Sequence, residues 1–176
     1  MSVYARRVCH NYPFPQADSH NRLVDLLTFL CESREKRDDN DIANYLEVHP
    51  RQARYYADAL CFFGLARLSG GYRLPTKLGR EIIDLPLLVA LERIAQIIFE
   101  RSIFSETAAY ERSFGELPSV DLVTAWILNE NPKLNSTTSS RRAQTVLSWA
   151  WAFRKHIPAA GCNNAAMADR PRAIAA

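Results

Sequence analysis

One segment constrains the fold of this chain more than any other: residues 49–74, HPRQARYYADALCFFGLARLSGGYRL. Pro50 suits the first turn of a helix and Gly64 suits the position just past its end, so a helix is predicted from about Pro50 to Phe63. After the glycine, two short strand-like runs flank a Ser-Gly-Gly turn at residues 69–71. This pattern is typical of a tight hairpin. The segment therefore predicts a helix followed directly by two antiparallel strands.

The residues on either side of this segment add further helices. From Asn21, leucines recur at the spacing of an amphipathic helix, which Ser19 or Asn21 is expected to cap. These leucines are Leu23, Leu26, Leu27 and Leu30. A charged loop follows, after which Asp39 or Asn40 is expected to cap the short helix DIANYLEV. Beyond the hairpin, Thr76 is expected to cap another helix.

The predicted order is thus helix, helix, helix, strand, turn, strand. A helix-turn-helix followed by a hairpin is the arrangement of the winged helix. The phrase FGLARLSGGYRLPTKLG resembles the usual winged-helix sequence at this point, although Pro75 stands before the threonine. The predicted fold class is mostly α: a winged helix-turn-helix of three helices and a two-stranded wing, packed on a second helical unit of helix-turn-helix type.

The second half is helical without a hairpin. The stretch LPLLVALERIAQIIFER predicts an apolar helix whose wide face indicates burial between two units. That face comprises Leu87, Leu88, Leu91, Ile94, Ala95, Ile98 and Phe99. Two helices are predicted over IFSETAAYERSF and SVDLVTAWILNE. A last helix from about Thr138 to Lys155 is expected to be capped by Ser136 or Thr137.

A chain of 176 residues holds one ordinary domain or two small ones. We expect an extended arm over residues 1–20, a winged-helix domain over 21–85, a second unit over 86–156 and a disordered tail over 157–176. No apolar run reaches the roughly 18 residues of a membrane span. The beginning of the chain lacks the apolar core of a secretion signal. A cytoplasmic protein with no membrane partner is therefore expected.

The charge is more informative in its distribution than in its net value of +3. Residues 49–80 carry six basic side chains against Asp58 alone, and residues 136–176 carry six against Asp169 alone. The intervening residues 81–135 carry four basic and nine acidic side chains. Each basic island falls on one of two similar helices, a pattern that favours nucleic acid as the partner over random clustering.

The helix from Pro50 carries the main candidate DNA-binding residues. Its inward stripe is expected to hold Ala53, Leu60 and either Tyr56 or Ala57. The side chains expected to face solvent are Arg51, Gln52, Arg54, Tyr55 and Asp58. Arg and Gln suit hydrogen bonding to base edges, and Tyr suits phosphate or sugar contacts. The alternative is a solvated face whose arginines serve solubility.

Two other sets of residues are candidates for DNA contact. In the wing these are Arg67, Arg73 and Lys77, for which ordinary hairpin charges are nearly as good an explanation. On the last helix, Trp149, Trp151 and Phe153 are expected to add bulk to an apolar stripe. The residues expected to face outward there are Ser139, Ser140, Arg141, Arg142 and Gln144. This helix either contacts DNA, braces the first unit or forms a dimer face.

The sequence offers no catalytic motif. Nucleases of the common restriction type hold magnesium through an acidic residue and a later Asp/Glu-x-Lys, and Glu35-Lys36 lacks the spacer. Phosphate-binding, zinc-protease and serine-hydrolase patterns are also missing. The four cysteines lie far apart, without zinc-site spacing. We expect no enzymatic activity, no metal and no cofactor.

Two motifs together carry a more specific resemblance. RQARYYADALCFFGLA and RRAQTVLSWAWAF, separated by an acidic helical middle, resemble a two-unit DNA-binding region of some type II restriction enzymes and related bacterial defence proteins. The resemblance covers roughly residues 12–155 and implies sequence-reading helices at 51–55 and 141–145. The layout also resembles the C-terminal module of certain ABC transporter ATPases, where it implies a regulatory role. This chain departs from both families because it carries no nuclease or ATPase portion.

The expected function is therefore recognition of double-stranded DNA. The chain is expected to act as a specificity component of a restriction or defence system, or as a transcriptional regulator. The sequence leaves two kinds of protein partner open: a nuclease or other defence subunit, and a second copy of the chain. The alternative is a protein–protein adaptor built on winged-helix units, without DNA binding. Whether the chain is complete or part of a larger protein is left open.

Overall fold

The computed structural model describes residues 16–17 and 19–156, with the His20 side chain excepted. Most of the predicted arm over residues 1–20 and the whole predicted tail over 157–176 lie outside the described residues. The elements are α1 (His20–Glu32), α2 (Asp39–Leu46), α3 (Pro50–Phe62), β1 (Ala66–Ser69), β2 (Tyr72–Pro75), α4 (Lys77–Ile83), α5 (Leu87–Phe99), α6 (Ser102–Phe114), α7 (Val120–Glu130), α8 (Ser136–Phe153) and a 3₁₀ turn, η2 (Arg154–His156).

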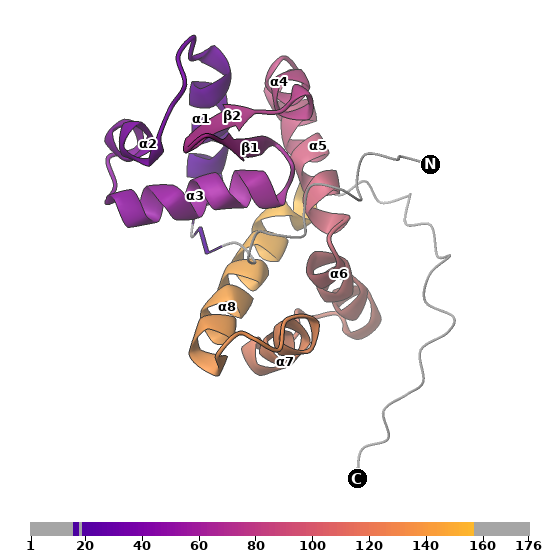
Figure 1. The fold of residues 1–176 in the computed structure, drawn as a ribbon. Coiled ribbons are helices and arrows are strands. Elements are labelled where there is room, and N and C mark those ends of the chain that lie inside the picture. Colours follow the sequence, from indigo (N-terminus) through magenta and orange to yellow (C-terminus); the bar gives the residue numbers. More distant parts are fainter. Residues whose placement is uncertain (1–15, 18, 157–176) are drawn as a thin grey trace.

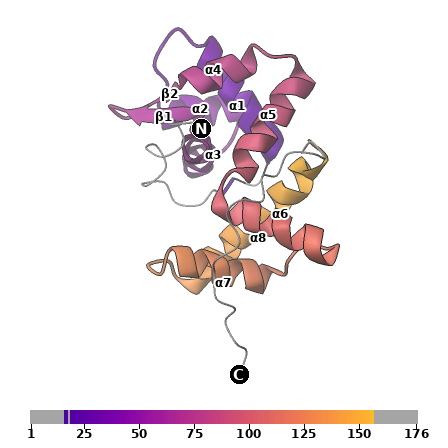
Figure 2. The ribbon, with the colours of Figure 1, turned by 90° about the vertical axis from the view of Figure 1, so that its right-hand side faces the viewer.

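The molecule is mostly helical, with one small antiparallel sheet in the described part, which confirms the predicted fold class at that level. Helices α1 to α4 and the hairpin lie together at one end, and α6 to α8 lie at the other (Figure 1). Helix α5 runs from the first group to the second, as the turned view in Figure 2 also shows. The buried side chains of both groups belong to one continuous hydrophobic cluster. None of the described helices combines the length and the apolar character needed to cross a bilayer.

The first two helices begin with side-chain caps. Ser19 Oγ accepts a hydrogen bond from the Arg22 N–H at 3.5 Å, so Ser19 rather than Asn21 caps α1. Asp38 caps α2, and the prediction of Asp39 or Asn40 was wrong by one residue. The Asp38 carboxylate accepts from the N–H groups of Asn40 and Asp41, while the Asp41 carboxylate accepts from the Asp38 N–H. This reciprocal capping box satisfies donors that a cap at Asp39 would leave without partners.

Helix α3 and the hairpin follow the predicted pattern. Pro50 is the first residue of α3, and the His49 side chain caps it by accepting from the Arg51 N–H at 3.2 Å. Gly64 ends the helix with φ of +74°, a conformation that favours glycine. The strands pair from Ala66↔Pro75 to Ser69↔Tyr72 around the two turn glycines. The Arg73 N–H also donates to the Arg37 carbonyl at 2.8 Å, which joins the α1–α2 loop to the hairpin.

Thr76 joins the end of the hairpin to the end of α3 by hydrogen bonds. Its hydroxyl donates to the Gly64 carbonyl at 2.8 Å, and the same oxygen accepts from the Gly79 N–H at 3.1 Å to cap α4. The Thr76 N–H donates to the Leu65 carbonyl at 2.9 Å. Helix α4 therefore begins directly against the backbone that follows α3.

Replacement of Gly79 by alanine is expected to lower the free energy of unfolding by about 2 kcal/mol. A Cβ there would overlap the Leu65 carbonyl oxygen and lie 3.1 Å from Leu27 Cδ1. Because this carbonyl is held by Thr76, it has little freedom to move, and the overlap outweighs the better helix propensity of alanine. Urea denaturation of the two proteins measures the difference. The exposed Glu81→Ala change on the same helix is the control, and equal losses in the two variants would show that the overlap is relieved.

The predicted inward face of α5 was wrong at its first turn. Leu87 and Leu88 are 66% and 69% exposed, whereas Ile94, Ala95 and Ile98 are buried. Periodicity correctly marks the apolar side of the helix, but it carries no information on where the neighbouring elements stop. Helix α5 is therefore packed from Ala90 onward, after the exposed residues of its first turn.

Helix α8 begins at Ser136, two residues earlier than predicted. The Asn135 carboxamide oxygen accepts from the Thr138 N–H at 2.7 Å, so Asn135 is the cap instead of Ser136 or Thr137. At the other end the α-helix stops at Phe153 and a 3₁₀ turn continues to His156. The helix is therefore shifted toward the amino terminus relative to the prediction, and Arg141 and Arg142 lie in its second turn.

The two tryptophans near the end of α8 have opposite environments. Trp149 is fully buried, stacks on Phe63 with ring centroids 5.3 Å apart, and donates from its indole to the Ala17 carbonyl at 3.0 Å. Trp151 is 60% exposed, so the prediction that it adds to the buried stripe was wrong. Because α8 has a helical period, neighbours two positions apart cannot both face inward. We call the contact of α3 and Phe63 with α8 the α3–α8 seam.

Candidate nucleic-acid interface

The first turns of α3 present a polar face to solvent. Arg51, Gln52 and Arg54 are exposed, as predicted, whereas Tyr55, which was also predicted to face solvent, is half-buried. Buried on the opposite side are Ala53, Tyr56, Ala57 and Leu60. Arg51 Nε donates to the Tyr55 hydroxyl at 2.8 Å, and its guanidinium lies 5.9 Å from the centre of the same ring. The Arg51 side chain is therefore held along α3 by its own neighbour one turn later.

Arg54 is positioned by the preceding helix. Its Nε lies 2.9 Å from Asp39 Oδ2 at the start of α2, and its side chain remains 63% exposed. An ion pair this exposed contributes little to stability. The ion pair instead fixes the direction of the exposed Arg54 guanidinium relative to α2, which packs against α3.

Arg73 is not on the surface of the hairpin, and its prediction as a DNA-contacting residue is corrected by the structure. It is 4% exposed, with Nη2 2.9 Å from Asp58 Oδ1 and Nε 3.3 Å from Asp39 Oδ1. Its Nη1 also donates to Cys61 Sγ at 3.7 Å. The strand places Arg73 on the face that packs against α3, and the two carboxylates make that burial tolerable.

Asp58 is likewise not a solvent-facing residue, because its carboxylate is half-buried against Arg73. Burial raises the pKa of Asp58, and the attraction of Arg73 offsets this only in part. Burial works against the charged form of Arg73, but Asp58 leads the charges that outweigh it and raise the pKa of the guanidinium. Arg73 is therefore a permanent cation holding two carboxylates.

The hairpin keeps a mixed outer surface. Arg67 is exposed, as are Leu68 at 48% and Tyr72 at 39%, and the Lys36 ammonium lies 5.6 Å from the centre of the Tyr72 ring. Lys77 has a 92% exposed side chain whose ammonium lies 3.6 Å from the Glu81 carboxylate one turn later. Arg67 and Lys77 are thus accessible, whereas Arg73 is not.

Helix α8 divides the predicted outward residues into two groups. Arg141 and Gln144 are exposed, and Ser140 is half-buried. Ser139 is fully buried and Arg142 is 6% exposed, so the outward orientation predicted for these two was wrong. The signal was available in the sequence: Ser139, Arg142 and Val146 lie at positions i, i+3 and i+7, which is the spacing of the inward stripe. The polar residue types concealed that continuation.

Arg142 has an unusual environment for a buried cation. Its Nε and Nη1 atoms are buried without a hydrogen-bond partner. Burial lowers the pKa of the guanidinium, and Tyr55 of α3 opposes that shift, so the two side chains are electrostatic neighbours across the α3–α8 seam. The structure therefore brings part of each basic island to one place, which the sequence did not reveal.

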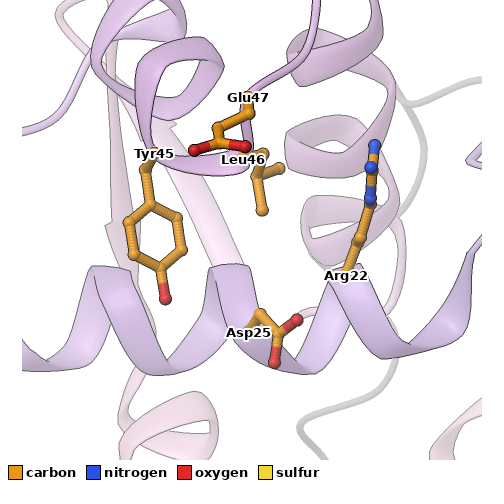
Figure 3. A pocket seen from close by; sticks show the side chains of 5 residues that line it. All are labelled: Arg22, Asp25, Tyr45, Leu46 and Glu47. Carbon is orange, nitrogen blue, oxygen red and sulfur yellow. The ribbon is translucent and has the colours of Figure 1, made fainter.

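A pocket of about 280 Å³ lies elsewhere, between α1 and the end of α2. Its lining comes from Arg22 and Asp25 of α1 and from Tyr45, Leu46 and Glu47 (Figure 3). No residue of α3, the hairpin or α8 lines it, and sequence reasoning did not identify it. Within the described residues, no three His, Cys, Asp or Glu side chains gather where they would hold a metal ion.

Comparisons with known proteins give one match. No curated protein and no solved structure matches the chain. A family model described as a domain of unknown function, DUF7226, matches residues 22–156, which include α3, the hairpin, α8 and the seam between them. Since the match spans most of the 176 residues, the chain belongs to the DUF7226 family.

Proposed function

We propose that this protein binds double-stranded DNA and that the amino-terminal turns of α3 enter the major groove. The observation that carries the proposal is the exposed Arg51, Gln52 and Arg54 at the front of the third helix of a helix–helix–helix–hairpin order. In helix-turn-helix proteins, the front of the second helix of the motif contacts base edges. Arg pairs with guanine and Gln with adenine through two hydrogen bonds each.

The proposal that α3 enters the major groove is also supported by the hairpin after it, because helix, helix, helix, hairpin is the order of a winged helix. The hairpin follows α3 after a single glycine-ended turn, and the carbonyl of Arg37 pairs with the N–H of Arg73 on its edge. Arg67 in β1 and Lys77 just after β2 are exposed, where a wing approaches the DNA backbone. The proposed contact residues are Arg51, Gln52, Arg54, Tyr55, Arg67, Lys77, Arg141 and Gln144.

Arg73 has a positioning role in this proposal. It bonds one oxygen of Asp39, and Arg54 bonds the other. Asp39 thereby links a buried cation to an exposed one, and the direction of Arg54 depends on the interior of the domain. A side chain fixed before binding loses less conformational entropy when it contacts a base.

The physiological role proposed is recognition without catalysis. The similarity of the two arginine-rich motifs to those of restriction enzymes and bacterial defence proteins supports a specificity component of such a system, with a nuclease as partner. A transcriptional regulator uses the same surface. Selection from a random duplex pool distinguishes both roles from an adaptor, because only a sequence reader enriches a defined site.

Binding to the selected duplex is expected to weaken steeply with salt. Contacts to about five phosphates give a log–log slope of about −4 to −5. Arg54→Ala is expected to weaken binding by about 1–3 kcal/mol and to relax the preference at one base pair. Fluorescence anisotropy against matched and single-mismatch duplexes, over a range of salt concentrations, measures both effects.

The matched control is Arg93→Ala, which removes an exposed arginine from α5 and leaves α3 unchanged. It is expected to bind like the unmodified protein. Binding that is insensitive to salt, or an Arg54→Ala variant that behaves like Arg93→Ala on every duplex, would falsify the proposal.

A protein adaptor is the second candidate, and one specific observation favours it. Leu87, Leu88 and Val89 are 66%, 69% and 45% exposed in consecutive positions at the start of α5. Exposed apolar clusters commonly mark protein contacts. A pull-down with and without nuclease treatment separates the candidates, because an adaptor keeps its partner after DNA is digested and loses it when Leu88 is changed to serine.

A further inference from the structure

Two arginines of this protein are buried to nearly the same extent but in opposite electrostatic environments. Arg73 is 4% exposed and contacts the carboxylates of Asp39 and Asp58. Arg142 is 6% exposed, and its Nε and Nη1 have no hydrogen-bond partner. Burial of a cation without a partner is strongly unfavourable, so natural proteins rarely keep one without a ligand or a partner. The α3–α8 seam therefore has an excess of positive charge and of hydrogen-bond donors.

Arg142 forms no ion pair with a carboxylate among the described residues. Tyr55 of α3 is its electrostatic neighbour, and the hydroxyl of Tyr55 accepts the Arg51 Nε–H at 2.8 Å. Arg51 itself is exposed and forms no ion pair with a carboxylate among the described residues. Tyr55 thus interacts with two guanidinium groups, with that of Arg51 through a hydrogen bond and with that of Arg142 electrostatically. An anion between them would satisfy both.

We infer that Arg142, Tyr55 and Arg51 form a binding site for one phosphate group across the α3–α8 seam. Guanidinium N–H groups match phosphate oxygens in geometry and charge, and such charge-assisted hydrogen bonds are the strong ones. The tyrosine hydroxyl supplies one more hydrogen bond to a phosphate oxygen. If the phosphate belongs to the DNA backbone, the inference rests on the function proposed above; the other source of the same chemistry is free phosphate.

Phosphate binding requires the Arg142 side chain to turn toward the surface, since little of it is exposed. Its long unbranched stem allows this without movement of α8. This change of direction is favoured because it removes Nε and Nη1 of Arg142 from a buried position where they have no hydrogen-bond partner. On duplex DNA, α3 would then contact bases while α8 contacts the backbone through Arg142. The second group of helices thereby fixes the register of α3 in the groove without reading sequence.

The test uses Arg142→Met in the full chain. Methionine occupies a similar volume without charge, so the thermal midpoint is expected to equal or exceed that of the unmodified protein. Affinity for the selected duplex is expected to fall about 3- to 10-fold at about 150 mM salt, and the salt slope to become shallower by about 1. Arg142→Lys, which keeps the charge, is expected to recover part of the loss. Arg93→Met on α5 is the matched control and is expected to change neither quantity.

A second arm uses inorganic phosphate in place of DNA. Phosphate, compared with chloride at equal ionic strength, is expected to raise the thermal midpoint of the unmodified protein by about 2–4 °C and that of Arg142→Met by less than about 1 °C. This arm tests the site even when no duplex binds. A phosphate effect without any duplex binding would assign the site to free phosphate and reject the DNA-binding proposal.

Two results overturn the inference itself. One is a salt-dependent duplex interaction that Arg142→Met leaves unchanged in affinity and slope, in which case the DNA-binding proposal stands and the backbone contact does not. The other is a lower thermal midpoint of Arg142→Met together with an undiminished phosphate effect, which would make Arg142 a packing residue. With neither duplex binding nor a phosphate effect in the unmodified protein, both proposals fail.

Discussion

Trp149→Ala is expected to lower the free energy of unfolding by about 4 kcal/mol, the largest effect of any single substitution considered for this protein. Trp149 is fully buried, and its ring stacks on Phe63 at a centroid distance of 5.3 Å. Its indole N–H bonds the Ala17 carbonyl at 3.0 Å. Truncation would therefore leave a cavity at the α3–α8 seam and an unpaired carbonyl in the interior.

Two variants separate these contributions. Trp149→Phe keeps an aromatic ring on Phe63 and loses the hydrogen bond, and it is expected to cost about 1–2 kcal/mol. Trp151→Ala removes the same side-chain type two residues later, where it is 60% exposed, and it is expected to cost under about 0.5 kcal/mol. Urea denaturation followed by far-UV circular dichroism measures all three. Similar losses at positions 149 and 151 would contradict the buried seam.

Arg73→Met is expected to lower the free energy of unfolding by about 3 kcal/mol at about pH 7. The substitution removes the cation that lies 3.3 Å from the Asp39 carboxylate and 2.9 Å from the Asp58 carboxylate. Asp39 keeps its ion pair with Arg54, whereas the half-buried Asp58 loses the partner that offsets its burial. Arg67→Met on the facing strand removes an exposed arginine and is the matched control, with an expected loss under about 0.5 kcal/mol. Chemical denaturation of the two variants measures the difference.

The loss in Arg73→Met is expected to shrink on acidification. Burial raises the pKa of Asp58 above its ordinary value of 3.8, and Arg73 opposes this, so the pKa rises further without Arg73. A carboxyl group with a raised folded-state pKa contributes stability below its unfolded-state pKa, and that contribution is lost as pH rises through the folded-state pKa. The variant should thus be closest to the unmodified protein near about pH 4.

Adding Asp58→Asn to Arg73→Met supplies the second check. This change removes the carboxylate that the lost cation leaves buried, so the double variant is expected to regain about 1–2 kcal/mol at about pH 7 and to lose the dependence on pH between about 4 and 7. A double variant as unstable as Arg73→Met at every pH would assign the loss to packing instead of charge.

Much of the candidate site followed from the sequence, because α3 obeys local rules. Pro50 begins the helix, Gly64 ends it, and the helical period separates Arg51, Gln52 and Arg54 from the buried stripe. The hairpin register likewise follows from the two turn glycines, whose φ values of +59° and +84° other residues rarely adopt. These features depend on residues close together in the chain, and the structure has them as predicted.

The roles of individual arginines did not follow from the sequence. Arg73 and Arg67 face opposite sides of one hairpin, and Arg142 and Arg141 are adjacent on one helix. Which member of each pair is buried depends on elements far away in the chain: Asp39 lies 34 residues before Arg73, and Tyr55 lies on α3 far ahead of Arg142. Residue type predicted four exposed cations where the structure has two.

The helices and strands were predicted from sequence alone, with ends correct to within a residue or two, because capping, turn geometry and periodicity act over a few residues. The sequence also determined which faces are apolar. Three features came from the tertiary structure alone: Leu87 and Leu88 lie outside the packed core, Arg73 holds two carboxylates, and the buried Arg142 has two nitrogen atoms without a hydrogen-bond partner. Burial and charge pairing are properties of contacts between distant segments, so they exist only once the chain has folded.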